Sequence, residues 1–311
     1  MQQITDTILM VRPINFRMNE QTAVNNYYQQ SIDNVLPATI QKQAEEEFDT
    51  FVKKLRKAGV RIVVVQDTLE PNTPDSIFPN NWVSFHTDGT VGVYPMFAEN
   101  RRLERREDIL EQLESEGFLI ENVVDYTSAE EDQLFLEGTG SIILDRVNNI
   151  AYCALSPRAD EDLFIEFCED FEYTPVIFTA NQTVNGERKA IYHTNVMMAL
   201  AEDFAVICLD SIDDKKERKM VLKQLKESGK QIVAITEAQV EQFAGNMLAV
   251  KNAKGERITI MSEAAYQSLN ANQVGIIEKH SKILYSKINT IETCGGGSVR
   301  CMMAEVFLPR A

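Results

Sequence analysis

The sequence has few of the residues that build metal centres and disulfide frameworks. It contains three histidines, His86, His193 and His280, and five cysteines at scattered positions. Zinc sites need paired Cys or His ligands at short intervals, and no such spacing occurs. A GxGxxG fingerprint and a phosphate-binding loop are also missing. We therefore expect neither a metal nor a cofactor, and a reducing compartment that keeps the cysteines as thiols.

Long apolar runs and an excess of positive charge are missing too. No apolar stretch approaches the roughly 18 residues needed to cross a bilayer, and the N-terminal MQQITDTILMVRP does not resemble a signal peptide. The formal net charge of -16 disfavours nucleic acid, because phosphate affinity needs clustered Lys and Arg. The densest basic segment, RRLERRE at 101–107, alternates with glutamate, which favours a solvated helix. These absences predict a cytoplasmic protein that binds neither membranes nor nucleic acid.

The composition is that of a folded globular protein. Of 311 residues, 44% are hydrophobic and 25% charged, which is enough apolar material for a large core. We expect a single domain over residues 1–311. The sequence leaves the oligomeric state open, with a homo-oligomer among the alternatives.

A pattern of strand, turn, strand, helix, strand recurs along the chain at intervals of roughly 50 residues. In the second unit, NWVSF and TVGVYP flank the turn TDG, RRLERREDILEQLESEG is an amphipathic helix, and FLIENVV is a buried strand. The later units repeat this order, with helices expected at 160–170, DDKKERKMVLKQLKESG and EAAYQSLNANQ.

The first unit lacks one strand, having only ILMVRP before a helix at 44–57 and the strand RIVVVQ. The C-terminal VRCMMAEVFLP can supply the missing strand and close a ring of five units without an open sheet edge. The sequence thus predicts an α/β fold, a five-fold pseudosymmetric propeller built from strand-strand-helix-strand units. An open α/β sheet is the alternative.

Polar residues stand just before or at the start of the first hairpin strand of each unit. If the units are equivalent, these side chains point to one place near the ring axis. Burying them unpaired would cost roughly a few kcal/mol each, so they must find partners or face a cavity. The set comprises Asn80, Asn81, Glu137, His193, Asn195, Asn246 and Cys301.

A thiol, an imidazole and a carboxylate in one pocket form the constellation of nucleophilic catalysis. The segment CGGGSVRC offers a glycine run, whose backbone can approach a substrate closely, directly before Cys301. Cys294 is the competing thiol, but it stands off the repeat register and is expected in a loop. Cys153, Cys168 and Cys208 are expected to be buried and inert.

Each of these residues also has a purely structural interpretation. His193 alone could be a core histidine, Asn80 and Asn81 could be turn residues, and Glu137 could open a hairpin. The catalytic interpretation depends on all of them sharing one register.

Four segments in this order resemble the pentein superfamily of arginine deiminases, dimethylarginine hydrolases, succinylarginine dihydrolases and amidinotransferases. PDSIFPNNW is similar to the superfamily's Pro-Asp...Phe-x-x-Asp segment, LEGTG to its Glu-Gly-Gly, YHTN to its His-x-Asp, and GGGSVRC to its glycine-rich cysteine segment. The resemblance covers nearly the whole chain. It implies a five-unit propeller with Cys301 as nucleophile, His193 as acid and base, and Glu137 beside it.

The resemblance also implies contacts to a small amino-acid substrate. Arg158, in ALSPRAD, matches an arginine that holds the substrate α-carboxylate, which suits the fork of a guanidinium. Asp75 matches an aspartate near the substrate's amino end. Arg101 or Arg102 could contribute, with a solvated surface role as the alternative.

Asn81 and Asn195 stand where deiminases place carboxylates that pair with the guanidinium of the substrate. An amide cannot supply that charge, but it can donate to and accept from a neutral urea. The chain therefore resembles the citrulline-utilising branch of the superfamily, which implies hydrolysis of citrulline to ornithine, carbon dioxide and ammonia. The alternatives are an arginine deiminase or dihydrolase, a succinylarginine dihydrolase, an amidinotransferase and a non-catalytic binding protein.

Overall fold

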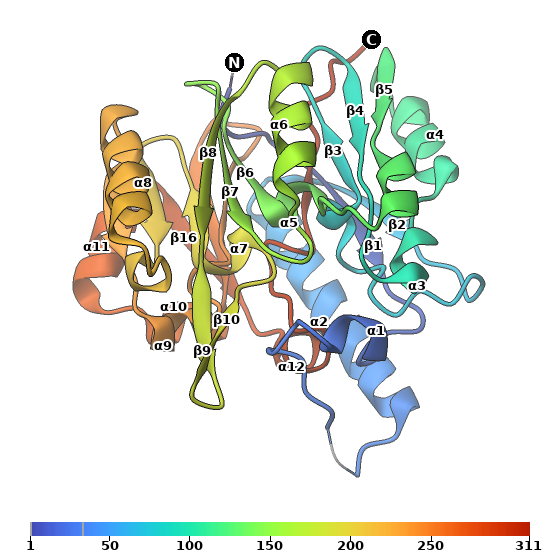
Figure 1. The fold of residues 1–311 in the computed structure, drawn as a ribbon. Helices are drawn as coiled ribbons and strands as arrows, with labels where there is room; N and C mark the ends of the chain where they lie inside the picture. Colours follow the sequence, from blue (N-terminus) through green and yellow to red (C-terminus); the bar gives the residue numbers. More distant parts are fainter. Residues whose placement is uncertain (1, 33) are drawn as a thin grey trace.

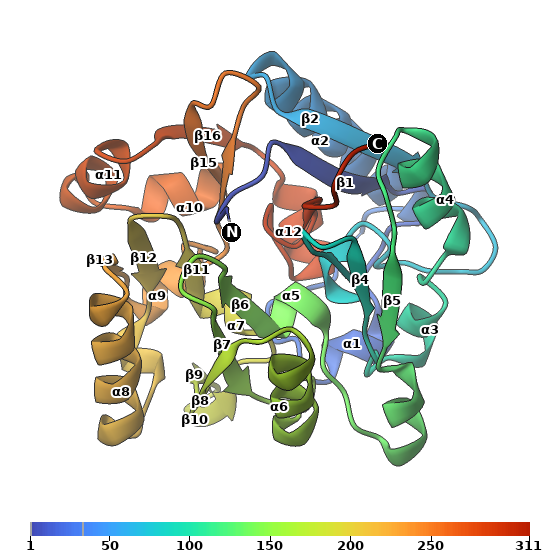
Figure 2. The same ribbon diagram turned by 90° about the horizontal axis from the view of Figure 1, so that it is seen from above.

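The computed structural model describes residues 2–32 and 34–311 and has a mixed α/β fold. Fifteen of its strands form five three-stranded sheets, and the remaining pair forms a separate hairpin. In each of the five sheets the middle strand pairs antiparallel with one neighbour and parallel with the other. Figure 2 shows the sheets arranged around a common centre, with the longer helices on the outside.

The elements follow one another along the chain as Figure 1 labels them. The five sheets comprise β1 (Thr7–Arg12), β2 (Arg61–Gln66) and β17 (Ala304–Glu305); β3 (Val83–Phe85), β4 (Thr90–Val93) and β5 (Asn122–Asp125); β6 (Ile142–Asp145), β7 (Ile150–Leu155) and β8 (Thr174–Thr179); β11 (Met198–Leu200), β12 (Phe204–Ile207) and β13 (Gln231–Ala234); and β14 (Leu248–Lys251), β15 (Arg257–Ser262) and β16 (Lys282–Ser286). The separate hairpin comprises β9 (Asn181–Val184) and β10 (Glu187–Ala190).

The α-helices are α1 (Glu20–Ala23), α2 (Pro37–Lys57), α3 (Glu99–Arg102), α4 (Glu107–Ser115), α5 (Gly138–Ser141), α6 (Glu161–Asp170), α7 (Thr194–Met197), α8 (Lys215–Glu227), α9 (Glu237–Val240), α10 (Glu263–Ser268), α11 (Ala271–Glu278) and α12 (Asn289–Gly295). Three 3₁₀ helices join them, η1 (Pro79–Asn81), η2 (Thr127–Asp132) and η3 (Leu209–Ser211). None of the helices in the described ranges is long and apolar enough to cross a membrane.

Helix α6 shows how local sequence places the outer helices. The Asp160 carboxylate caps its first turn by accepting from the backbone N–H groups of Asp162 and Leu163. Leu163, Phe164 and Phe167 recur at helical spacing and are buried against the sheet. The predicted helix at 160–170 is therefore confirmed.

The two ends of the chain meet in one sheet, as the sequence predicts. β17 pairs antiparallel with β1, with Leu9 opposite Ala304 and Ile8 opposite Glu305. The C-terminal strand is shorter than expected, so Cys301 lies in a turn ahead of it rather than in the strand. The N–H of Cys301 donates to the carbonyl of Ser298 at 3.0 Å within this turn.

The prediction of a single solvated helix at 101–117 is wrong in two respects. It is divided into α3 and α4, and Arg101 and Glu104 are buried at 2% and 3% exposure rather than solvated. The two charges are buried together because they form an ion pair at 2.9 Å. The helix expected in the fifth unit likewise divides into α10 and α11, and the hairpin β9–β10 is not predicted by the repeat.

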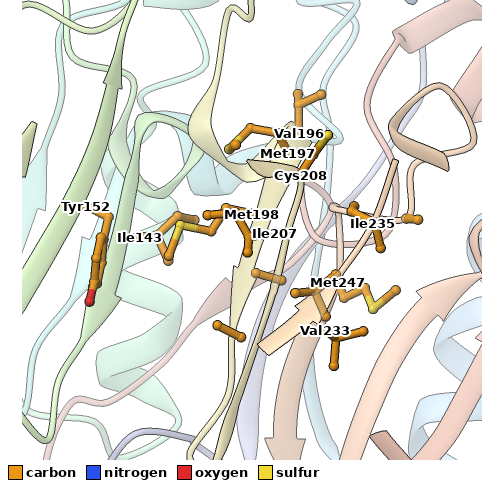
Figure 3. Close-up of a cluster of buried hydrophobic side chains, with 14 of the residues drawn as sticks. Ile143, Tyr152, Val196, Met197, Met198, Ile207, Cys208, Val233, Ile235 and Met247 are labelled. Atoms are coloured by element: carbon orange, nitrogen blue, oxygen red, sulfur yellow. The ribbon is translucent and has the colours of Figure 1, made fainter. Parts of the chain in front are cut away.

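The apolar core joins neighbouring sheets. Its largest cluster connects the β6–β8 sheet with the β11–β13 sheet and includes Ile143, Tyr152, Met198, Ile207 and Val233 (Figure 3). Side chains from adjacent sheets interdigitate here, which fixes the sheets relative to each other. Val196 and Met197 belong to this cluster, so its packing also holds the short helix α7 in place.

Candidate active site

The polar residues singled out from the sequence lie at short helical turns around the centre of the molecule. Glu137 directly precedes α5, and His193 directly precedes α7. Asn81 ends η1, and Asn195 lies in α7. The sequence prediction placed these residues just before or at the start of strands. In the structure α5 lies between Glu137 and the strand that follows, α7 lies between His193 and its strand, and Asn195 is part of α7.

Glycines in LEGTG allow these turns to approach one another. A Cβ on Gly138, which has φ +43°, would lie 2.6 Å from the carbonyl oxygen of Asn80. One on Gly140 would lie 2.6 Å from Nδ2 of Asn81 and 2.8 Å from Nδ1 of His193. Only glycine fits at both positions, because any larger residue would push the three turns apart.

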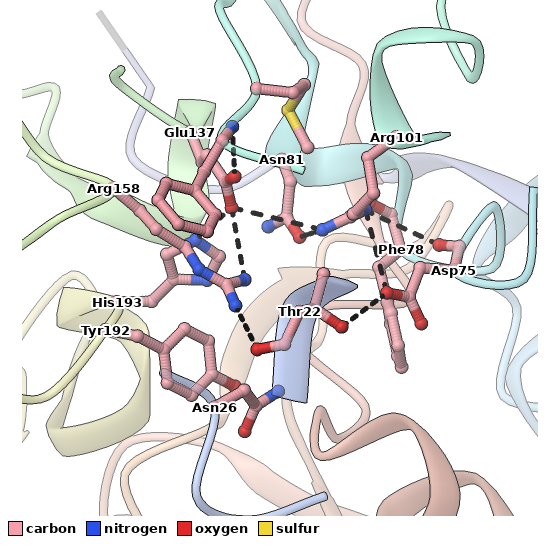
Figure 4. Close-up of polar contacts among 12 residues, drawn as sticks. Thr22, Asn26, Asp75, Phe78, Asn81, Arg101, Glu137, Arg158, Tyr192 and His193 are labelled. Atoms are coloured by element: carbon pink, nitrogen blue, oxygen red, sulfur yellow. Dashed lines mark hydrogen bonds and ion pairs between the residues drawn. The ribbon is translucent and has the colours of Figure 1, made fainter. Parts of the chain in front are cut away.

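One small pocket gathers most of the candidate residues, and Figure 4 shows how they face one another. Glu137 lies against His193 at the edge of this pocket, and Asn80 and Asn195 adjoin Asn81 and Cys301 respectively. The structure thus brings all of the predicted site residues into one region. The pocket is lined by Thr22, Asn26, Asp75, Phe78, Asn81, Arg101, Arg158, Tyr192, His193, Gly295, Gly297 and Cys301.

His193 and Glu137 form a short, fully buried pair. Nε2 of His193 lies 2.6 Å from Oε2 of Glu137, and the side chains are 1% and 0% exposed. The other carboxylate oxygen accepts from the backbone N–H of Phe97 at 3.0 Å. A carboxylate can only accept, so the proton lies on Nε2 of His193 and Nδ1 is left to accept one.

The charge states of this pair follow from its surroundings. Burial alone would raise the pKa of Glu137, but the Arg158 guanidinium, the hydrogen bond from His193 and Arg101 outweigh it and lower the pKa to about 2. Burial dominates for His193, and its pKa is lowered to about 4 although Glu137 opposes this. At neutral pH the pair is a carboxylate beside a neutral imidazole.

Two side-chain amides contact the sulfur of Cys301. Its Sγ lies 3.5 Å from Nδ2 of Asn195 and 3.3 Å from Nδ2 of Asn246. Cys294, the competing thiol, lies in α12 rather than in the expected loop and packs in the apolar core. Burial raises the pKa of Cys294 and of the remaining thiols, Cys153, Cys168 and Cys208, which keeps them protonated.

The amide of Asn81 has a defined orientation. Arg101 donates from Nη1 to Oδ1 of Asn81 at 2.7 Å, and an arginine side chain has no acceptor. Nδ2 of Asn81 then donates to Oδ1 of Asn80 at 3.0 Å, and Asn80 donates to Oγ1 of Thr139 at 3.3 Å. The orientation of the Asn81 amide is therefore fixed: its oxygen faces the Arg101 guanidinium, and one of its two N–H groups is left over for a ligand.

Arg101, and not Arg102, is the arginine that reaches the pocket. Its guanidinium donates from Nε and Nη2 to both carboxylate oxygens of Glu104 at 2.9 Å and lies 4.0 Å from carboxylates of Asp75 and Glu137. Burial raises the pKa of Glu104 to about 7, although Arg101 opposes this. Arg102 points outward, where it donates to the carbonyl of Met96 and lies 3.5 Å from Glu130.

A segment near the N-terminus covers Arg158 and Asp75. Arg158 donates to Oδ1 of Asn25 at 2.8 and 2.5 Å and to the carbonyl of Thr22 at 2.8 Å. Asp75 accepts at Oδ2 from Nδ2 of Asn19 at 2.8 Å and from Oγ1 of Thr22 at 3.1 Å, while its buried Oδ1 has no partner among the described residues. The sequence analysis missed these contacts, because the segment carries no repeat signal.

Metal chemistry has no support in the described residues. Within 2–32 and 34–311, no group of three or more His, Cys, Asp or Glu side chains is arranged to hold an ion.

A mixed α/β fold with this arrangement of side chains is that of the guanidino-modifying pentein enzymes. The family model described as N,N dimethylarginine dimethylhydrolase, eukaryotic, matches residues 12–308. The chain belongs to this family. The resemblance to the pentein superfamily inferred from the sequence is thus confirmed, while a search of curated protein sequences finds no match.

Solved structures with the same fold include ArgZ, an arginine dihydrolase from the ornithine-ammonia cycle in cyanobacteria, at TM-score 0.74 and 17% identity over 98% of this chain. The chain spans only 41% of ArgZ. Unliganded AgrE matches at TM-score 0.73 and 18% identity, over 98% of this chain and 40% of AgrE. A dimethylarginine dimethylaminohydrolase variant, seen as an adduct with S-methyl-L-thiocitrulline, matches at TM-score 0.64 and 14% identity, over 97% of this chain and 99% of that chain. At such identities the likeness establishes the fold.

Proposed function

We propose that this protein is a cysteine hydrolase that cleaves the ureido group of citrulline, or of a close analogue, to ornithine, carbon dioxide and ammonia. The observation that carries the proposal is the orientation of Asn81, whose oxygen faces the Arg101 guanidinium and whose amino group donates one N–H to Asn80 and keeps the other for a ligand. A ureido oxygen accepts hydrogen bonds, whereas a guanidinium only donates them.

The charge of the pocket supports the same substrate class. Among the described residues that line it, Asp75 is the one carboxylate, and it already accepts two hydrogen bonds. The pocket also contains the guanidinium groups of Arg101 and Arg158. Glu104 pairs with Arg101 at 2.9 Å and Glu137 lies 3.5 Å from Arg158, so both guanidinium groups already have carboxylate partners. What the described lining lacks, Asp75 aside, is a carboxylate to pair with a guanidinium headgroup, and a neutral urea does not need one.

The proposed reaction begins with Cys301. His193, neutral at rest, accepts the thiol proton, and the thiolate attacks the ureido carbon. The bond from this carbon to the ornithine nitrogen breaks, His193 returns the proton to that nitrogen, and a carbamoyl thioester remains on Cys301. Water, activated by His193, then releases carbamate, which breaks down to carbon dioxide and ammonia. Glu137 keeps Nε2 of His193 protonated, so that Nδ1 handles the proton.

The remaining candidates hold the substrate. Asn81 and Asn195 donate to the ureido oxygen as negative charge develops on it, and Asn80 orients Asn81. Arg158 pairs with the α-carboxylate and Asp75 with the α-amino group. In this structure Arg158 donates to the side chain of Asn25 and to the carbonyl of Thr22. The segment around α1 therefore has to release these contacts when the substrate carboxylate binds.

Arginine dihydrolysis is the second candidate. It is favoured by the fold likeness to ArgZ, which is described as an arginine dihydrolase, and the family model carries the name of a dimethylarginine hydrolase. Both reactions would use the same thiol and imidazole. They differ in the headgroup, which would then have to be a guanidinium.

We also propose the finer features of the architecture and setting. The common strand order of the five sheets supports a five-fold pseudosymmetric propeller, and the family match from 12 to 308 supports one domain over residues 1–311. The unpaired cysteines support a cytoplasmic location, where thiols stay reduced.

Product analysis tests the proposal. The purified protein is incubated separately with citrulline, arginine, N,N-dimethylarginine and N-succinylarginine, and ornithine and ammonia are measured beside a Cys301→Ala control. Release of both products from citrulline, lost in the control, is the expected result. Preferential turnover of arginine would favour the dihydrolase, and the absence of turnover with all four would overturn the proposal.

A further inference from the structure

Asn246 contacts the sulfur of Cys301 from a part of the chain that supplies none of the other residues proposed for the site. It precedes β14 and is 1% exposed. Its Nδ2 lies 3.3 Å from Sγ of Cys301, which is the shorter of the two amide contacts to this sulfur. A residue that touches the reacting atom can act in the chemistry itself.

The orientation of the Asn246 amide is fixed on both sides. Its Oδ1 accepts from the backbone N–H of Arg300 at 3.0 Å, and its Nδ2 donates to the backbone carbonyl of Asn195 at 3.0 Å. A backbone N–H only donates and a carbonyl only accepts, so the amide cannot be turned around. Asn246 therefore presents an N–H group, and never its oxygen, to Cys301.

The orientation of the Asn195 amide is not fixed in the same way. Its Nδ2 lies 3.5 Å from Sγ of Cys301, and its Oδ1 lies 3.8 Å from the same sulfur. Within the part of the chain that the structure describes, the one further hydrogen bond of this amide is a long one, from Nδ2 to the carbonyl of Thr139 at 3.5 Å. Asn195 can therefore face a thiol with its oxygen or a thiolate with its nitrogen, whereas Asn246 is fixed for the thiolate.

Gly245 brings Asn246 into position. A Cβ on Gly245 would lie 2.2 Å from the carbonyl oxygen of Val196 and 2.8 Å from Cα of Met197, both in α7. No larger residue fits between this segment and α7, so the backbone before Asn246 packs directly on the helix that contains Asn195. The position of the donor is built into the packing of the two segments.

We propose that Asn246 is a further catalytic residue, a fixed N–H donor that stabilises the thiolate of Cys301. This inference rests on the proposed role of Cys301 as nucleophile. A hydrogen bond to an ionised group is stronger than one to its neutral form, so the donor favours the reactive thiolate. It remains in place during attack, because its other two bonds do not involve the sulfur.

The other charged and titratable groups around Cys301 are the same in the wild type and in the variants compared below. Asp75, Arg101, Arg158, Tyr192 and His193 line the same pocket from other elements. Next to Cys301 in the chain, the guanidinium of Arg300 is paired with Glu305 at 2.9 Å. A change in Cys301 titration on replacement of Asn246 therefore reports the loss of its N–H group.

The test is a pH titration of the ultraviolet absorbance of the Cys301 thiolate, taken as the difference between each protein and the same protein carrying Cys301→Ala. Asn246→Ala is expected to raise the midpoint by about one pH unit or more, the scale of one charge-assisted hydrogen bond. Asn246→Asp keeps the shape and the acceptor for Arg300 but turns an oxygen toward the sulfur, so the midpoint should rise further. Circular dichroism checks that each variant is folded.

Asn252→Ala is the matched control, because it removes another buried asparagine, 5% exposed, at the far end of the same β14 strand. Its midpoint should equal that of the wild type. Folded Asn246→Ala or Asn246→Asp protein with a wild-type midpoint would overturn the inference. The titration needs no substrate, so failure of citrulline turnover would count against the proposed function and leave this result standing.

Discussion

Nη1 of Arg101 lies 2.7 Å from Oδ1 of Asn81, and each residue is 2% exposed. This contact fixes which end of the Asn81 amide a ligand can meet. Because an arginine can only donate, the amide oxygen faces Arg101, and the amino group keeps one N–H, beyond the one given to Asn80, for the headgroup of the substrate.

Replacing Asn81 by aspartate should change the substrate preference. The new carboxylate offers an acceptor to a guanidinium and cannot donate to a ureido oxygen, so we expect kcat/KM for citrulline to fall by about tenfold or more, and the ratio of arginine to citrulline turnover to rise. Steady-state kinetics with both substrates measures the change. Asn122→Asp, on the exposed part of β5, is the control. An unchanged ratio would contradict the role given to Asn81.

Glu137→Gln should reduce kcat for the preferred substrate by roughly 10² to 10⁴ fold, the usual contribution of acid and base catalysis. A neutral amide next to His193 no longer stabilises the imidazolium that forms when the thiol proton is accepted. Ammonia release under saturating substrate measures the effect. Glu114→Gln, on the exposed face of α4, should retain full activity. If Glu137→Gln stays within a few fold of the wild type, Glu137 is a structural residue only.

The low pKa of His193 predicts how stability depends on pH. The folded protein binds a proton at His193 only below about pH 4, whereas an unfolded chain does so below about pH 6.5. The unfolded state therefore binds more protons between these values, and stability rises with pH across this window. Relative to His193→Gln, the free energy of unfolding of the wild type should increase by about 3 kcal/mol from pH 4 to 6.5. Urea denaturation at several pH values measures this, and a pH-independent difference would refute it.

Arg101→Leu should destabilise the fold by about 3 to 5 kcal/mol, because it leaves the buried Glu104 without its partner. The loss should be smaller at pH 6 than at pH 8, since the pKa of Glu104 is about 7 and the protonated acid needs no counterion. Arg102→Leu, one position along, removes a partly exposed arginine and should lower stability by only about 1 kcal/mol or less. Chemical denaturation of the Arg101→Leu and Arg102→Leu variants measures the two losses of stability. Equal losses would contradict the role given to the buried Arg101.

Asn25→Ala should lower KM several fold with little effect on kcat. Asn25 accepts two hydrogen bonds from Arg158, and a substrate carboxylate has to replace it. Without Asn25, Arg158 still donates to the Thr22 carbonyl but binds a substrate carboxylate more readily. An increase in KM would instead show that Asn25 binds the substrate directly.

The repeat made much of the site predictable from the sequence. Glu137, His193 and Cys301 recur at one register of a strand-strand-helix-strand pattern, and that periodicity is a local property of the chain. The structure places all three in one region, with Glu137 and His193 directly before short helices and Cys301 in a turn. The short helices α5 and α7 were not predicted, because four-residue turns contain no periodic signal.

The errors have a common physical origin. The sequence predicts Arg101 and Glu104 to be surface residues, because a pattern of charges cannot distinguish a solvated helix from a buried ion pair between residues three positions apart. The contacts of Arg158 with Thr22 and Asn25 join residues more than 130 positions apart. Such contacts depend on how the units pack, which no local pattern encodes.

The most direct test of the central claim is to trap the covalent intermediate. Wild-type protein is mixed rapidly with citrulline, quenched in acid during turnover and analysed by mass spectrometry, with Cys301→Ala treated in parallel. We predict a mass increase of one carbamoyl group, mapped to the peptide that contains Cys301 and missing from the variant. Turnover without any adduct, or an adduct on Cys294 instead, would contradict the assignment of Cys301 as the nucleophile.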